Sequence, residues 1–154
     1  MKLRTIVLTL VVCFVVGAVC LASNPQMGTW KLNEAKSKIA AGAAKNTMVV
    51  YTAAGDKVTV TVDGVDGAGK PLHNEWTGSF DGKDFPVTGD PTSDSRSYTK
   101  VDDHTLALTV KKDGKVTLTG RIAVSADGKT RTVSGSGTDS MGMKIEIMSV
   151  YDKQ

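Results

Sequence analysis

One short turn signal, Asp-Gly-Lys, occurs three times in this chain, at residues 81–83, 113–115 and 127–129. An Asp-Gly pair readily adopts the positive backbone dihedrals of a tight hairpin, so each copy is typical of a place where one antiparallel strand turns back on the next. The runs between these turns alternate apolar residues with Thr or Ser. Such alternation is the pattern of strands with one buried and one wet face. The chain is therefore predicted to form a β-meander.

Alternation and bounding turns predict ten strands. Val58, Val60 and Val62, for example, alternate with Lys and Thr residues and share one face. A meander of this length avoids exposed edges by closing, so we expect an all-β, antiparallel up-and-down β-barrel of about 8–10 strands. The Ala-rich stretch 34–45 lacks an apolar stripe, which predicts a short helical turn or a loop after the first strand. The predicted strands span residues 28–33, 46–53, 57–63, 71–80, 84–88, 95–101, 104–111, 115–125, 130–138 and 144–151.

The first 22 residues have the pattern of an export signal. A basic start with Lys2 and Arg4 precedes an apolar run over residues 6–16. Cys20 and Ala22 place small side chains at the two positions that a signal peptidase inspects, which predicts cleavage after Ala22 and a periplasmic or secreted protein. The alternatives are a retained membrane anchor, for which the run is short, and lipidation of Cys20. The three residues before Cys20, at 17–19, lack the usual Leu at the first position and a small residue at the third.

Residues 23–154 then form one domain of 132 residues, long enough to bury a core. This domain has 17 basic and 16 acidic side chains, so no electrostatic argument for nucleic acid remains. Both cysteines, Cys13 and Cys20, lie in the signal, and the domain must be stable without a disulfide. We expect a monomer with no nucleic-acid partner and no stable membrane insertion once the signal is removed.

A family resemblance is carried by Gly28-Thr29-Trp30-Lys31-Leu32 in the first strand and by Val150-Tyr151-Asp152-Lys153 at the end of the meander. These segments resemble the lipocalin and fatty-acid-binding-protein (calycin) superfamily, and also a lipocalin-like group of small exported bacterial proteins. The resemblance implies that Gly28 and Trp30 close the bottom of the barrel. It also implies an interior that binds a small, mainly hydrophobic or amphipathic ligand. A two-helix lid, as fatty-acid-binding proteins have, needs more chain than the twelve residues 34–45.

The role of Arg121 has three possible interpretations. The segment that ends in Arg121 is similar to the fatty-acid-binding-protein segment whose arginine helps to hold the ligand carboxylate, and Tyr151 resembles the terminal tyrosine of that site. Ser149, however, stands where a second arginine is expected. Alternation favours the surface instead, because the apolar residues of the same strand have the opposite parity. As a third possibility, Arg121 or Arg131 packs across Trp30 as a cation–π pair that closes the barrel.

Residue size decides whether such a barrel holds a ligand, because an eight-strand interior is just wide enough for side chains or one small molecule. Our first hypothesis is a carrier that binds its ligand without chemical change. The alternative is a ligand-free cell-envelope structural or protein-interaction module with a packed barrel. The predicted inward set is Val58, Val60, Val62, Leu72, Trp76, Phe80, Leu106, Leu108, Val116, Leu118, Ile145 and Ile147. The candidate ligand-binding residues are Trp76, Phe80, Leu106, Leu108, Tyr151 and Arg121.

Signals for catalysis or a resident metal are weak. The domain has no cysteine nucleophile, no Gly-x-Ser-x-Gly elbow and no phosphate loop. His73 and Glu75 share a strand face but have no third ligand in view. Met141, Met143 and Met148 suit either a copper(I) site or, as we favour, apolar filling at a barrel end. We therefore expect no catalytic residue, no metal and no cofactor, and a binding protein rather than an enzyme.

Overall fold

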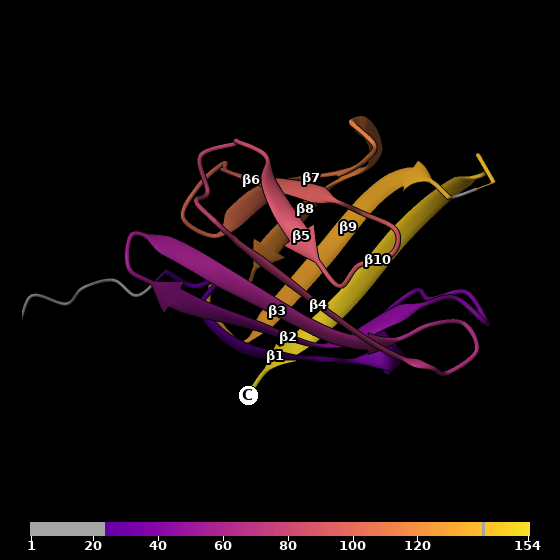
Figure 1. Cartoon of the computed structure of the whole chain (residues 1–154). Helices are drawn as coiled ribbons and strands as arrows, with labels where there is room; N and C mark the ends of the chain where they lie inside the picture. Colours follow the sequence, from indigo (N-terminus) through magenta and orange to yellow (C-terminus); the bar gives the residue numbers. More distant parts are fainter. Residues whose placement is uncertain (1–23, 140) are drawn as a thin grey trace, which may run out of the picture.

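The computed structural model describes residues 24–139 and 141–154. Ten antiparallel strands follow one another around a closed barrel, in which β1 meets both β2 and β10 (Figure 1). This confirms the predicted all-β, up-and-down barrel. The predicted signal and its cleavage site lie outside the described residues. The strands are β1 (Gly28–Leu32), β2 (Lys45–Ala54), β3 (Lys57–Val65), β4 (Pro71–Gly78), β5 (Phe85–Thr88), β6 (Ser95–Lys100), β7 (Thr105–Lys112), β8 (Lys115–Val124), β9 (Thr130–Thr138) and β10 (Lys144–Lys153).

A single turn of 3-10 helix, η1 (Glu34–Lys36), follows β1, as predicted for this stretch. The side chain of Asn33 accepts a hydrogen bond from the Lys36 amide and caps this turn. Across residues 24–139 and 141–154, no helix has the length and apolar character needed to cross a membrane.

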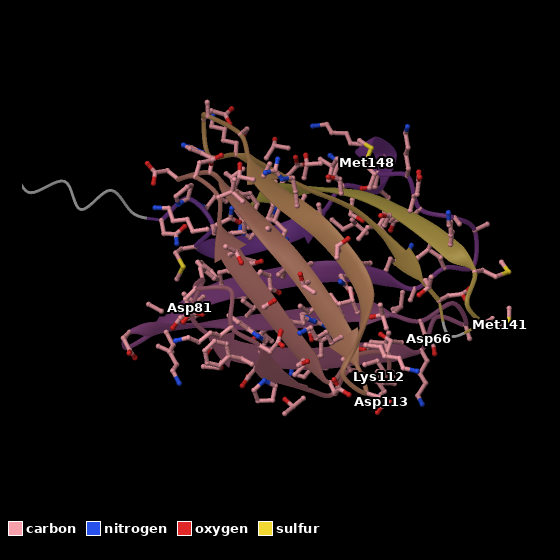
Figure 2. All side chains as sticks on the ribbon, turned by 90° about the horizontal axis from the view of Figure 1, so that it is seen from above. Asp66, Asp81, Lys112, Asp113, Met141 and Met148 are labelled. Atoms are coloured by element: carbon pink, nitrogen blue, oxygen red, sulfur yellow. The ribbon has the colours of Figure 1, made fainter. Side chains whose placement is uncertain are left out.

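The up-and-down topology gives the barrel two different ends. The end that carries the β1–β2, β3–β4, β5–β6, β7–β8 and β9–β10 connections is called the loop end below. The other end, the terminal end, holds the start of β1 and the finish of β10. Figure 2 shows Asp66, Lys112, Asp113 and Met141 together at the loop end, whereas Asp81 lies at the opposite end.

Only one of the three Asp-Gly-Lys signals forms the tight two-residue turn. Asp113 and Gly114 both have positive φ, 51° and 73°, and Lys112 pairs with Lys115 across the turn. At the other two copies only the glycine has positive φ. There the aspartate side chain accepts a hydrogen bond from the amide two residues on, as Asp127 does from Lys129, and the connection is longer.

The inward face of the barrel changes in exposure from one end to the other. Near the terminal end it is buried, with Trp30, Tyr51 and Ile122 each at most 2% exposed. At the loop end the inward side chains are only half-buried, namely Leu32, Leu72, Val110, Leu118, Ile145 and Ile147. Val116, which we predicted to face inward, is 53% exposed. This prediction was wrong because the register shift between Val110 and Lys111 pairs Val116 with Lys111, whereas Leu118 pairs with the inward Val110, so Val116 leaves the inward face.

Trp30 is completely buried at the foot of the barrel. Its indole nitrogen donates a hydrogen bond of 2.9 Å to the backbone oxygen of Gln26, and the Gln26 side chain donates to the backbone oxygen of His104. The segment before β1 therefore ties Trp30 to the β6–β7 connection. No arginine among the described residues packs on Trp30 as the third interpretation required. Lys153, the partner of Trp30 in the β1–β10 register, has its Nζ 5.0 Å from the ring centre instead.

Candidate functional site

A buried arginine lies inside the barrel. Arg131, on the inward face of β9, is 3% exposed. Its Nη2 donates a hydrogen bond of 2.7 Å to the Tyr51 hydroxyl from β2. Its guanidinium carbon lies 5.0 Å from the Tyr51 ring centre and 5.2 Å from the Tyr151 ring centre, so the two aromatic rings hold the cation between them.

Two of the three guanidinium nitrogens of Arg131 are left without a partner. Neither Nε nor Nη1 has a hydrogen bond to any residue in the described part of the chain. The ion pairs found among residues 24–139 and 141–154 do not include Arg131, so no carboxylate there balances its charge. A buried cation is costly unless it is paired and hydrogen-bonded. The unpaired donors therefore point to an acceptor that the described residues do not provide.

The two tyrosines keep their protons at neutral pH. Burial raises the pKa of the Tyr51 hydroxyl far above its ordinary value, although the neighbouring Arg131 charge opposes this shift. Burial raises the pKa of Tyr151 in the same way. A neutral Tyr51 accepts from Arg131 and still has its own O–H to donate. The site thus presents donors from both Arg131 and Tyr51, which suits an anionic acceptor such as a carboxylate.

An aromatic cluster borders the arginine on one side. Trp76 is fully buried and stacks on Phe80, with ring centres 6.3 Å apart. Tyr98 meets Trp76 edge-on at 4.6 Å, and Phe80 meets Tyr51 edge-on at 6.4 Å. Phe80 comes from the β4–β5 connection, so a side chain outside the strands covers the ring that contacts Arg131.

A second arginine of the interior is neutralised by its own carboxylate. The Nη2 atom of Arg96 donates to Asp90 Oδ2 at 2.5 Å, and both side chains are nearly buried. Although burial opposes the shift, hydrogen bonds from Ser93 and Thr92 together with the Arg96 charge lower the pKa of Asp90. Arg96 is therefore a paired structural cation, whereas the buried Arg131 has no carboxylate partner among the described residues.

The structure places five of the six residues predicted to bind ligand in or against the core, and the sixth on the surface. Trp76, Leu106, Leu108 and Tyr151 are buried in the core, with Phe80 packed against it. Arg121 lies on the outer face of β8, where its side chain is exposed, so it does not line the interior. The physical reason is parity, because Ile122, which follows it, is 1% exposed and faces inward.

The other sequence candidates lie on the surface. Met141 and Met143 are 78% and 59% exposed at the β9–β10 connection, which corrects the prediction that they fill a barrel end. His73 is exposed beside Asp63, whose Oδ1 lies 2.6 Å from His73 Nδ1. No group of three His, Cys, Asp or Glu side chains able to hold a metal occurs within residues 24–139 and 141–154, and Glu75 is exposed.

Two open hollows lie on the surface of the described part of the chain, away from Arg131. The smaller, of about 160 Å³, lies over β8 and β9 between residues 116–119 and 136–138. The larger, of about 460 Å³, lies beside η1 and includes Lys31 and Asp152. Neither hollow is lined by Arg131 or Tyr51.

Sequence reasoning missed Tyr51 and assigned Arg131 only a possible place over Trp30. One local signal was available, because Arg131 has the same parity as the half-buried Val133 and so belongs to the inward face of its strand. Its pairing with Tyr51 had no local signal, since the two residues are 80 positions apart.

No protein-family model matches the chain, and a comparison with curated proteins finds no match. The fold and site alone define the class, which is a closed ten-strand antiparallel β-barrel with an arginine buried in its interior. This architecture is compatible with a lipocalin-like fold.

Proposed function

We propose that this protein is a binding barrel of the lipocalin-like type, which takes up a small, mainly hydrophobic molecule with an acidic head and leaves it chemically unchanged. The observation that carries the proposal is the Arg131 guanidinium, buried to 3% exposure with two nitrogens unpartnered. A ligand carboxylate at this position would supply both the missing charge and the missing acceptor. The apolar side chains of the inward face would then contact the rest of the molecule.

The loop end is the proposed route of entry. Its inward side chains are half-buried, whereas Trp30 and Gln26 seal the terminal end at 0% and 1% exposure. The barrel wall also has its fewest strand pairings at β5, which pairs with β4 through two residue pairs and with β6 through two more. A wall with so few ladder hydrogen bonds opens at low cost, which would let the interior widen around a ligand.

A titration of an acid against its alcohol tests this proposal. Decanoic acid and decanol have the same chain, so only the head group differs. We expect wild-type protein to bind both, and Arg131→Met to bind the acid at least tenfold more weakly while the alcohol changes little, because only the acid loses a charge-assisted hydrogen bond. Arg121→Met removes an exposed arginine and is the matched control, with both affinities unchanged. Equal binding of the acid by wild type and Arg131→Met would contradict the proposal.

The second candidate function is a packed barrel that binds no small molecule and acts through its surface. The observation that favours it is the aromatic cluster of Trp76, Phe80, Phe85 and Tyr98, whose rings meet at 4.6–6.3 Å, together with hollows that avoid Arg131. Failure of wild-type protein to bind either decanoic acid or decanol at millimolar concentration would support this candidate. A water molecule or a small inorganic anion would then partner Arg131.

A further inference from the structure

A second unpartnered polar side chain lies on the inward face of the barrel, at Asn74 in β4. Its neighbours of the same parity are Leu72 and Trp76, and Val62 is its partner in the β3–β4 register. Asn74 is 7% exposed, and its Oδ1 has no hydrogen-bond partner in the described chain. A buried amide oxygen without a partner is unfavourable, so Asn74 also points to a group that residues 24–139 and 141–154 do not supply.

The position of Asn74 relative to Tyr51, the tyrosine that contacts Arg131, follows from the strand registers. Trp76, Val60 and Tyr51 form one cross-strand row on the inward face. Asn74 lies two residues before Trp76, in the row nearer the loop end. Because strand residues two apart are separated by roughly 6.6 Å along the strand, Asn74 faces a different part of the interior from Tyr51. A molecule whose head is held by Arg131 and Tyr51 together, and whose body extends from Tyr51 toward the loop end along β3 and β4, would pass Asn74.

We infer that Asn74 is a specificity-determining residue, which hydrogen-bonds a hydroxyl group on the apolar body of the ligand. This inference rests on the proposed function and narrows the ligand class to hydroxylated hydrophobic acids. A hydroxyl fits best because it can donate to the amide oxygen and also accept from the amide nitrogen, whichever of the two faces it. A purely apolar body would leave the amide oxygen unpaired.

The experiment compares decanoic acid with its mono-hydroxylated isomers on wild-type protein, Asn74→Leu and Arg131→Met. We expect wild type to prefer at least one mid-chain hydroxy isomer over decanoic acid by about tenfold, the worth of one well-made hydrogen bond. Asn74→Leu keeps a branched side chain of similar shape without the amide, and it should lose the preference and bind decanoic acid at least as tightly as every hydroxy isomer, because the buried hydroxyl then has no partner. Arg131→Met should weaken every acid and keep the preference for the hydroxy isomer.

The outcomes separate the two proposals. Binding of decanoic acid and all hydroxy isomers with equal affinity by wild type, together with loss on Arg131→Met, would overturn the role of Asn74 and leave the proposed function intact. Binding of none of the acids would overturn both. The comparison of hydroxylated with plain acid on wild-type protein needs no variant, and equal affinities there would by themselves overturn the role of Asn74. The urea midpoint of ligand-free Asn74→Leu is a second measurement. We expect it at or above the wild-type midpoint, because the variant removes an unpaired buried amide oxygen. A lower midpoint would indicate that Asn74 has a structural partner instead.

Discussion

Arg131 and Tyr51 are 80 positions apart in the chain, and the arginine donates a hydrogen bond of 2.7 Å to the tyrosine hydroxyl inside the barrel. This bond joins β9 to β2, which are not neighbours in the sheet. It satisfies one guanidinium nitrogen and leaves Nε and Nη1 unpartnered within the described chain. In the ligand-free barrel these buried, unpaired donors lower the free energy of unfolding. Arg131 is therefore a candidate for function rather than for stability.

The first prediction concerns the stability that is lost through the unpaired nitrogens of Arg131. The double variant Tyr51→Phe with Arg131→Met replaces the hydrogen-bonded pair by apolar groups, and it should stabilise the ligand-free protein by about 1–4 kcal/mol. Arg131→Met alone should gain less, because the Tyr51 hydroxyl then loses the partner that it has in the structure, at a cost of about 1–3 kcal/mol. Urea unfolding of the three proteins measures this. A double variant less stable than wild type would show that the pair is structural.

The second prediction concerns Trp30, which is 0% exposed at the foot of the barrel. Trp30→Ala leaves a large cavity and frees the backbone oxygen of Gln26, so it should cost ~3–5 kcal/mol. Trp76→Phe, at an equally buried position, keeps an aromatic ring and should cost clearly less. Urea midpoints compare the two variants, and a Trp30→Ala midpoint equal to that of wild type would rule out Trp30 as the closing residue.

The third prediction concerns acid pH. The pKa of Asp90 is lowered in the folded state, so the stability that this carboxylate contributes is complete above its unfolded pKa of about 4 and is lost as pH falls below it. Asp90→Asn should cost about 3–5 kcal/mol at neutral pH, because Arg96 is left buried and unpaired. Its stability should also fall less steeply than that of wild type below this pH. Asp56→Asn, at an exposed turn, is the control and should leave the pH dependence of stability unchanged. If stability falls equally steeply with pH in Asp90→Asn and in wild type, Asp90 is not the source of the acid sensitivity.

The fourth prediction concerns the close approach of β8 and β9. A Cβ atom on Gly135 would lie 2.5 Å from the backbone oxygen of Thr119 and 2.9 Å from the Cα of Gly120. Both contacts are with backbone, so the strands would have to separate, and Gly135→Ala should destabilise the barrel by about 1–3 kcal/mol. Ser136→Ala, at the exposed neighbouring position, should change thermal stability little. If Gly135→Ala melts at the same temperature as wild type, β8 and β9 can separate around the added methyl group without loss of stability.

The fifth prediction concerns export, which rests on the basic, apolar and small-residue pattern of residues 1–22. The protein recovered from the envelope or medium of an expressing cell should begin at Ser23 and carry no lipid. Its intact mass decides this directly. A mass that includes Cys20 with acyl chains would show a lipoprotein, and a full-length mass would show a retained anchor.

Much of the fold was predictable because its signals are local. Alternation placed all ten strands, and most boundaries differ from the structure by one or two residues. The tight turn at Asp113-Gly114 follows from residue chemistry alone. The candidate site was less predictable, because the family resemblance pointed to Arg121, whereas the cation that faces inward is Arg131. Burial of a side chain depends on which strand face closes inward, and alternation indicated that face in β8 more reliably than the resemblance did.

The sequence by itself determined the strands and the antiparallel meander, because side-chain period and turn conformation act between residues close together in the chain. Only the tertiary structure decided which polar groups are enclosed together. Tyr51, Arg131 and Tyr151 come from three strands, and their contact arises when β1 closes against β10 and brings the two ends of the meander together. Whether each guanidinium nitrogen and the Asn74 amide find a partner is then a property of the closed barrel, since burial is what makes an unpaired polar group costly.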